Sequence, residues 1–192
     1  LDEPFCSLDM HVKLKLRSEL PNILRNCNAS GLMVTHDPEE AMSICDKVAV
    51  MSEGKIHQID SPKKLLENPS TLFVSSFILG NNILNIKLEA NSCISCLGKI
   101  NISNLIDPKN IDHLSISPKF ISIKRSNNGD GLIIAKEFLG EFYIYKVSIN
   151  GETLRVRANI NNTLNIGDKC FLSIVKDSFF FLYPGAHKTY FK

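Results

Sequence analysis

The sequence predicts an α/β first half followed by an all-β second half that forms a small barrel. Three observations support this fold class. Residues 1–80 alternate apolar runs with helical patterns, residues 81–192 change to the twofold alternation of short strands, and Gly80, Asn81 and Asn82 interrupt the pattern between them. We therefore expect two domains, residues 1–80 and residues 81–192.

The composition is typical of a globular protein. The 192 residues are 44% hydrophobic and 22% charged, and no stretch approaches the roughly 18 apolar residues of a membrane helix. The first residues lack the basic and apolar layout of a signal peptide. We expect reduced thiols, because the six cysteines are scattered, and any membrane role would come through a partner.

Charge is shared unevenly between the two halves. Residues 1–80 hold eight Lys and Arg against eleven Asp and Glu, whereas residues 81–192 hold fourteen against nine. The positive charges of the second half are spread singly, and only Lys124 and Arg125 are adjacent. Solvated strand faces explain this pattern better than a nucleic-acid footprint, so we expect no nucleic-acid partner.

The first residues carry the strongest chemical pattern. Asp2 and Glu3 follow an apolar residue and precede Pro4, which would end a strand. In such a pair one carboxylate can hold Mg²⁺ through water, and the next can polarise an attacking water. A solvated loop is the alternative for this tripeptide taken alone.

A second segment changes that balance. Residues 32–35 predict a buried strand that ends at His36, and Asp37 and Pro38 then open a helix with Glu40 in its first turn. One helical stretch joins the two strands, so they form a βαβ unit whose chemical ends meet at one sheet edge. Taken alone, His36 would be a structural histidine; at this strand end it is a candidate functional residue.

Three motifs together resemble a known family. Leu-Asp-Glu-Pro at residues 1–4, Ser-Leu-Asp at residues 7–9 and Val-Thr-His-Asp-Pro-Glu-Glu-Ala-Met at residues 34–42 look like the Walker B end, D-loop and H-loop of an ABC transporter ATPase subunit. The resemblance is closest to importers of the maltose, polyamine and ferric-ion group. It implies that residues 1–80 are the C-terminal part of a P-loop ATPase domain.

The resemblance also implies roles for individual residues. Asp2 would lie on the Mg²⁺ side of bound ATP, Glu3 would be the general base, and His36 would contact the γ-phosphate. Three further residues would face the nucleotide and the partner subunit: Ser7, Leu8 and Asp9.

The family's assembly would then be a pair of ATPase subunits bound to transmembrane permease subunits at the cytoplasmic face of the plasma membrane. A solute-binding protein would act indirectly, outside the membrane. Among solutes, ferric iron is the leading expectation, followed by polyamines, with a sugar or another solute as further possibilities.

Two nucleotide motifs are missing from the sequence. It contains neither the phosphate loop G-x-x-x-x-G-K-[ST] nor the signature Leu-Ser-Gly-Gly-Gln. Backbone amides and a lysine of the phosphate loop normally cradle the phosphates. We therefore expect this chain to be the C-terminal part of a longer subunit and to be inactive as an ATPase by itself.

Helical and hairpin patterns divide the first half further. A helix is expected from Met10 to Asn26 with Asp9 as its N-cap, and Pro21 should kink or divide it. The other expected elements are helices over 38–45, 62–67 and 70–79 and a hairpin of strands 47–51 and 55–59.

The second half reads as a series of short strands and resembles the transport-associated OB region of the same importers. Asn150 and Gly151 predict a type I′ hairpin turn. The expected strands are 83–88, 99–102, 120–124, 132–138, 143–149, 153–158, 169–175 and 179–183.

Alternatives remain for three features of this half. The aromatic run at residues 179–183 suits a buried strand better than a binding platform. Cys93 and Cys96 have C-x-x-C spacing, but no second pair or nearby histidine completes a metal site. A rival function is a non-enzymatic OB-type module that binds a small ligand or an oligonucleotide.

Overall fold

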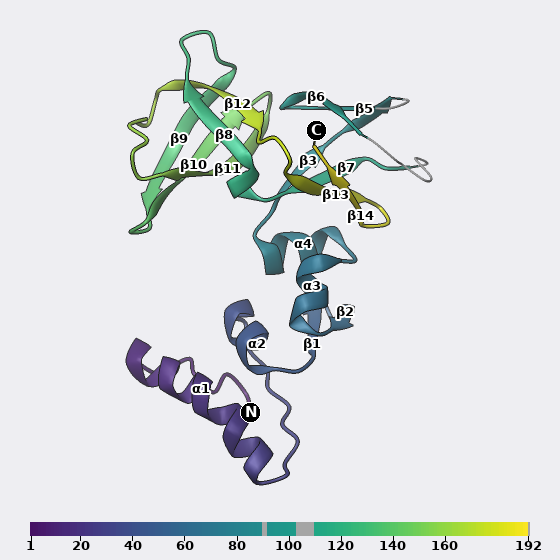
Figure 1. The fold of residues 1–192 in the computed structure, drawn as a ribbon, viewed down its shortest axis with the longest axis vertical. Coiled ribbons are helices and arrows are strands. Elements are labelled where there is room, and N and C mark those ends of the chain that lie inside the picture. Colours follow the sequence, from purple (N-terminus) through teal and green to yellow (C-terminus); the bar gives the residue numbers. More distant parts are fainter. Residues whose placement is uncertain (90–91, 103–109, 192) are drawn as a thin grey trace. The chain divides into compact units, whose positions relative to one another are not determined.

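The computed structural model describes residues 1–89, 92–102 and 110–191, and the chain divides into two compact units (Figure 1). The units are Leu1–Pro69 and Ser70–Lys192. The division falls before the helix over residues 72–79, whereas the change of sequence pattern at residues 80–82 predicts a boundary after it.

Helices dominate the first unit, together with one hairpin. Its elements are α1 (Met10–Asn26), α2 (Pro38–Ile44), β1 (Val48–Ser52), β2 (Lys55–Asp60) and α3 (Pro62–Glu67). Asp9 caps α1 as predicted, because its carboxylate accepts hydrogen bonds from the backbone N–H groups of His11 and Val12 at 3.0 and 3.2 Å. β1 and β2 pair antiparallel, also as predicted.

Pro21 lies inside α1, which continues to Asn26 and is not divided there. Of the two expected effects, a kink or a division, the division does not occur. A proline cannot donate a backbone hydrogen bond to the fourth residue before it, here Arg17, and its ring crowds that carbonyl. The turns on both sides keep their bonds, and the last turn closes where Cys27 N–H donates to Ile23 O at 3.0 Å.

The predicted buried strand before His36 is also wrong. Only one isolated parallel bridge forms, between Asp2 and Val34, and the side chain of Leu32 is 82% exposed. Parallel strands are stable mainly inside sheets that are covered on both faces, and no described segment supplies that cover here. The two segments still run side by side, because Val34 N–H donates to Leu1 O and Glu3 N–H donates to Val34 O, both at 2.9 Å.

The second unit is one helix followed by antiparallel sheets. The sheets have the strand orders β11-β10-β9-β12-β8, β14-β13-β7-β3 and β4-β5-β6. The five-stranded sheet comprises β8 (Ile121–Arg125), β9 (Gly131–Phe138), β10 (Phe142–Ile149), β11 (Glu152–Asn159) and β12 (Lys169–Ile174). The four-stranded sheet comprises β3 (Asn82–Asn85), β7 (His113–Ile116), β13 (Phe179–Tyr183) and β14 (His187–Tyr190). The remaining elements are β4 (Lys87–Glu89), β5 (Ser92–Ser95), β6 (Gly98–Asn101), the 3₁₀ helix η1 (Pro118–Phe120) and α4 (Leu72–Leu79).

An all-β second half is thus observed, and its described strands belong to three sheets, of which the five-stranded one is the candidate for the expected small barrel. The edge strands β8 and β11 approach each other, so the five-stranded sheet curls back on itself (Figure 1). The expected single strand over 83–88 is divided at Ile86 into β3 and β4. The N–H of Ile86 donates to Asp112 O at 2.9 Å, one position beyond the register of β3 and β7.

One hydrophobic core joins the three sheets. Phe180, Leu182 and Tyr145 are among its fully buried side chains. β13 is therefore a buried strand and not an aromatic platform, as predicted. It lies between β7 and β14 in the four-stranded sheet. The turn at Asn150 and Gly151 has φ angles of 49° and 83°, which is the backbone that a type I′ hairpin requires.

α4 belongs to this unit because it packs on β3 and β7. Ser75 Oγ on the helix lies 2.6 Å from Ser115 Oγ on β7, and Asn81 Nδ2 donates to both hydroxyls at 3.2 and 3.1 Å. These polar groups are satisfied within the packed interface, so they fix the helix on the sheet.

Candidate functional site

The parallel bridge brings Glu3 and His36 into direct contact. Oε1 of Glu3 accepts a hydrogen bond from the backbone N–H of His36 at 3.1 Å and lies 2.8 Å from Nδ1 of the ring. Glu3 has a φ of 43°, an uncommon backbone for a residue with a side chain. The sequence predicted that the segments ending at Glu3 and His36 meet at one edge, and the structure contains this contact.

The carboxylate changes the protonation of the histidine. The hydrogen bond that the ring donates to Glu3, and then the negative charge of Glu3, raise the pKa of His36 above its ordinary value of 6.5. Both groups remain accessible, because the side chains of His36 and Glu3 are 79% and 33% exposed. The pair can therefore present a proton donor and a proton acceptor to one bound molecule.

The other predicted site residues lie nearby in the chain, and their environments differ. Asp2 is exposed and forms the backbone bridge to Val34. Ser7 and Leu8 are exposed in the turn that precedes α1. The carboxylate of Asp9 caps α1. Among the described hydrogen bonds, the side chains of Glu3 and His36 bond to each other and not to these residues.

A cluster of charged side chains lies near the pair in the chain, and the sequence analysis did not include it in the site. Lys13 Nζ lies 2.6 Å from Glu40 Oε1 and 3.2 Å from Asp37 Oδ2. Arg17 Nη2 lies 2.9 Å from Asp37 Oδ2 and 3.3 Å from Glu40 Oε1. The signal for this cluster was the spacing of two cations four residues apart on one helix face, opposite an acidic first turn of the next helix.

Glu40 lies at the centre of the cluster, with only 3% of its side chain exposed. Burial by itself would raise its pKa, but hydrogen bonds from Lys13, Thr35 and Arg17 outweigh burial and hold the pKa of this carboxyl below 4.5. Sequence reasoning placed Glu40 in the first turn for its favourable charge there, and missed its burial.

No group of three or more His, Cys, Asp and Glu suited to a metal ion occurs in residues 1–89, 92–102 and 110–191. The exposed carboxylate of Asp2 beside Glu3 fits a magnesium ion that is shared with phosphate oxygens, since Mg²⁺ prefers hard oxygen ligands and keeps several waters. Most of the remaining ligands would have to come from the nucleotide and water.

Of the two cysteines with C-x-x-C spacing, Cys93 lies in the core of the second unit and Cys96 is partly buried against it. Cys93 is buried on β5, and burial raises the pKa of its thiol to about 11. Burial, together with the nearby charge of Glu152, raises the pKa of Cys96 to about 12. Both are free thiols, and these raised values disfavour the thiolate that metal or redox chemistry needs.

Comparison with known proteins shows what this chain is similar to. No protein-family model matches the chain. It is 34% identical over 174 residues to the Fe(3+) ions import ATP-binding protein FbpC of Haemophilus influenzae, covering 88% of this chain and 50% of that protein. The chain is homologous to the C-terminal half of ABC importer ATP-binding proteins.

Further ABC importer relatives agree. FbpC of Fusobacterium nucleatum is 31% identical over 187 residues, covering 92% of this chain and 50% of that protein. The spermidine/putrescine import ATP-binding protein PotA of Bacillus cereus is 48% identical over 84 residues, which are 44% of this chain and 26% of that protein. The chain thus spans about half the length of the ABC relatives that it matches over most of its own length.

ABC importers work at a membrane. In the described part of this chain, no helix has the length and apolar character needed to cross one.

Proposed function

We propose that this chain is part of the ATP-hydrolysing subunit of an ABC importer, in which ATP hydrolysis drives solute uptake. The observation that carries the proposal is the contact between Glu3 and His36 at the meeting point of two parallel chain segments. An oriented carboxylate beside a histidine of raised pKa suits hydrolysis of a phosphate chain by water.

In this proposal the two side chains have different tasks. Glu3 is the general base: it orients the attacking water and takes its proton. His36 donates a hydrogen bond to the γ-phosphate, where negative charge shifts during transfer. The contact with Glu3 favours the protonated ring, which supports the donor role.

Magnesium and ATP are the proposed cofactors. Asp2 would hold the Mg²⁺ side through water, because it is an exposed hard-oxygen ligand next to Glu3. The sequence contains no phosphate loop, so the main phosphate contacts would come from a part of the subunit outside this chain. We therefore propose that this chain alone does not hydrolyse ATP.

The proposed partners are a second ATPase subunit and the transmembrane permease subunits, at the cytoplasmic face of the plasma membrane. Ser7 and Leu8 are exposed, as contacts with a second subunit and its nucleotide require. Asp9 would contribute mainly by fixing the start of α1, because its carboxylate already accepts two backbone hydrogen bonds. A solute-binding protein would act through the permease.

Residues 81–192 are proposed to be an OB-like regulatory domain of the subunit. The curled five-stranded antiparallel sheet supports this proposal. Ferric iron is the proposed solute because relatives named for Fe(3+) import match 88% and 92% of the chain. Polyamine import is the second candidate, since PotA has a higher identity over a shorter segment.

Phosphate release by a full-length subunit that contains this chain tests the proposal. Glu3→Gln is expected to lower turnover by roughly 10²- to 10⁴-fold, the usual contribution of a general base. Glu39→Gln is the matched control, because this exposed glutamate lies in the first turn of α2 and outside the pair. Parental turnover in Glu3→Gln would contradict the proposal.

A further inference from the structure

The backbone on both sides of His36 is tied to the first turn of α2. Thr35 Oγ1 donates to Glu40 Oε2 at 2.6 Å and accepts from the backbone N–H of Asp37 at 3.1 Å. Asp37 in turn caps α2, accepting from the N–H groups of Glu39 and Glu40 at 2.9 and 3.4 Å. The residues before and after His36 therefore move with the start of that helix.

The start of α2 is held in turn by α1. Lys13 and Arg17 lie four residues apart on one face of α1, and each contacts the carboxylates of both Asp37 and Glu40. These contacts are shielded from water, since the exposed fractions of the Lys13, Arg17 and Glu40 side chains are 21%, 14% and 3%. Partial burial makes such pairs less sensitive to screening than surface pairs.

Lys13 and Arg17 compensate the charge of the buried Glu40 carboxylate. A buried carboxylate that loses its partners is an uncompensated charge, and the segment that carries it is driven towards water. The His36 ring is 79% exposed, and Glu3 is its one hydrogen-bond partner among the described residues. Its place therefore depends on the backbone around it and not on packing of the ring.

We propose that Lys13 and Arg17 are positioning residues, which act through Asp37 and Glu40 to hold His36 against Glu3. The inference rests on the proposed function only for the use of that pair in hydrolysis. The positioning itself can be measured without nucleotide.

The protonation of His36 reports on its position. The groups that face the ring are Glu3, Asp37 and Glu40, and all three raise its pKa, with Glu3 the largest contributor. Removal of a neighbouring cation can by itself only raise the pKa further, because the protonated ring is then repelled less. Loss of the Glu3 contact lowers the pKa. The two effects therefore have opposite signs.

The test is a titration of His36 by NMR in the 192-residue chain, with the resonance assigned by its loss in His36→Gln. Lys13→Met and Arg17→Met are each expected to move the midpoint to lower pH, towards that of an ordinary histidine. Lys13→Arg keeps a cation and is expected to keep the parental midpoint.

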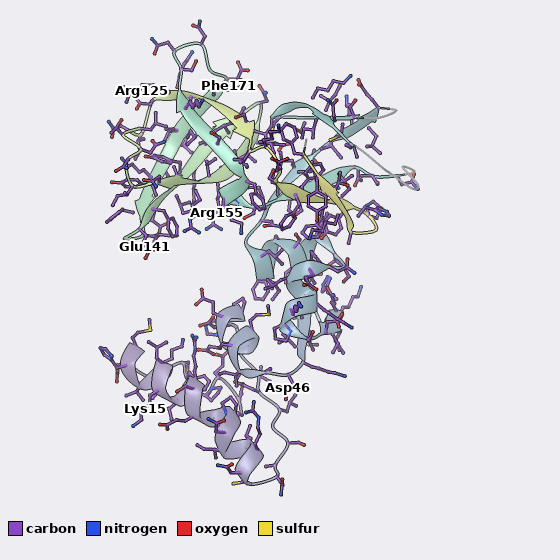
Figure 2. The ribbon with its side chains drawn as sticks, viewed as in Figure 1. Lys15, Asp46, Arg125, Glu141, Arg155 and Phe171 are labelled. Carbon is purple, nitrogen blue, oxygen red and sulfur yellow. The ribbon has the colours of Figure 1, made fainter. Side chains whose placement is uncertain are left out.

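Lys15→Met is the matched control. Lys15, labelled in Figure 2, lies on α1 with its side chain 74% exposed and 4.0 Å from Glu19. The Lys15→Met variant removes the same charge from the same helix without changing the cluster. The His36 midpoint should therefore stay at the parental value or rise slightly.

A midpoint that stays or rises in a folded Lys13→Met or Arg17→Met chain would overturn the positioning role. If the melting temperature also falls in that variant, the cation has a structural role alone. The two variants are independent, so the titration of either one, if it folds, tests the positioning role. Parental ATP turnover of Glu3→Gln in the full-length subunit would overturn the proposed function instead and leave this result standing.

Discussion

Glu3 and His36 are 33 positions apart in the chain, yet Oε1 of the glutamate lies 2.8 Å from Nδ1 of the imidazole. The same oxygen accepts the backbone N–H of His36 at 3.1 Å. The carboxylate is thus oriented by a main-chain group and a ring of one residue. Its side chain is still 33% exposed, so a water molecule can reach it.

Substitution of the two residues should separate turnover from nucleotide affinity in the full-length subunit. Glu3→Gln should lose turnover and keep ATP affinity, or increase it, because a negative charge beside an anionic nucleotide is removed. This variant should also hold two subunits together around ATP. His36→Ala should lower turnover as well, because a donor to the γ-phosphate is lost, but it should not trap that pair.

Turnover, ATP affinity and sedimentation of the two variants measure these effects. Asp2→Asn serves as the comparison, since it should weaken binding that depends on Mg²⁺. If Asp2→Asn leaves both assays unchanged while Glu3→Gln hydrolyses ATP normally, the assignment of the first residues is wrong.

The raised pKa of His36 predicts how pH affects the first unit. A pKa that is higher in the folded than in the unfolded chain favours folding below the unfolded value of 6.5. The contribution is lost as the pH rises through the folded value. Because the ring is exposed, we expect a small effect, visible as a difference in melting temperature between the parent and Glu3→Gln. That difference should be largest near pH 5.5 and fade at higher pH; a constant difference would contradict the pairing.

Local signals account for the elements that the sequence predicts well. Asp9, Asp37 and the pair Asn150-Gly151 each act on their own backbone, so a short window contains the cause of the cap or turn. The Glu3 and His36 contact was also predictable, because two strand-like segments joined by one helix have few ways to connect.

Non-local packing explains what the sequence could not predict. The burial of Glu40 depends on two cations more than twenty residues earlier in the chain. The alternating pattern of residues 81–192 predicts strands but not their partners, so it did not specify how the described strands are distributed among three sheets. Pro21 does not divide α1, and a local pattern could not predict this, because a proline inside a helical pattern can kink or end the helix.

The charged cluster predicts acid sensitivity. The pKa of Glu40 is lower in the folded than in the unfolded chain. The ionised carboxylate therefore contributes to stability above the unfolded pKa of 4.5, and this contribution is lost as the pH falls through the folded pKa. Glu40→Gln should destabilise the first unit by about 1–3 kcal/mol at pH 7, because the partly buried cations lose a charged partner. Urea unfolding at pH 7 and pH 3.5 measures this, with the exposed Glu39→Gln as control. A loss that is equal at both pH values would contradict a role for the ionised carboxylate.

The thiols should differ in reactivity. Cys6 and Cys27 are exposed, whereas burial raises the pKa of Cys93 and Cys96 to about 11 and about 12. A thiol reagent at pH 8 should therefore label Cys6 and Cys27 first, the partly buried Cys96 more slowly, and the buried Cys93 only after unfolding, since the thiolate is the reactive form. Mass mapping of labelled peptides identifies the sites. Rapid labelling of Cys93 in the folded chain would show that β5 is accessible.

Asn82 should contribute strongly to the stability of the second unit, because its amide acts as a substitute backbone partner. Its Nδ2 donates to Arg155 O, and its Oδ1 accepts from Arg155 N–H, both at 2.8 Å. Asn82 belongs to the four-stranded sheet and Arg155, labelled in Figure 2, to the five-stranded sheet, so this pair of bonds joins the two sheets. The asparagine is only 7% exposed.

Asn82→Ala should lower the free energy of unfolding by about 1–3 kcal/mol, because it leaves a backbone donor and a backbone acceptor of Arg155 without their partner. Asn82→Asp keeps an acceptor but cannot donate, so an intermediate loss is expected. Asn101→Ala is the control: this asparagine is an exposed residue of β6, and its replacement should change stability by less than about 0.5 kcal/mol. Urea unfolding followed by circular dichroism compares the three variants with the parent. Equal stability of Asn82→Ala and Asn101→Ala would mean that water replaces both bonds at no cost, and the two sheets would then be held together by their shared apolar core alone.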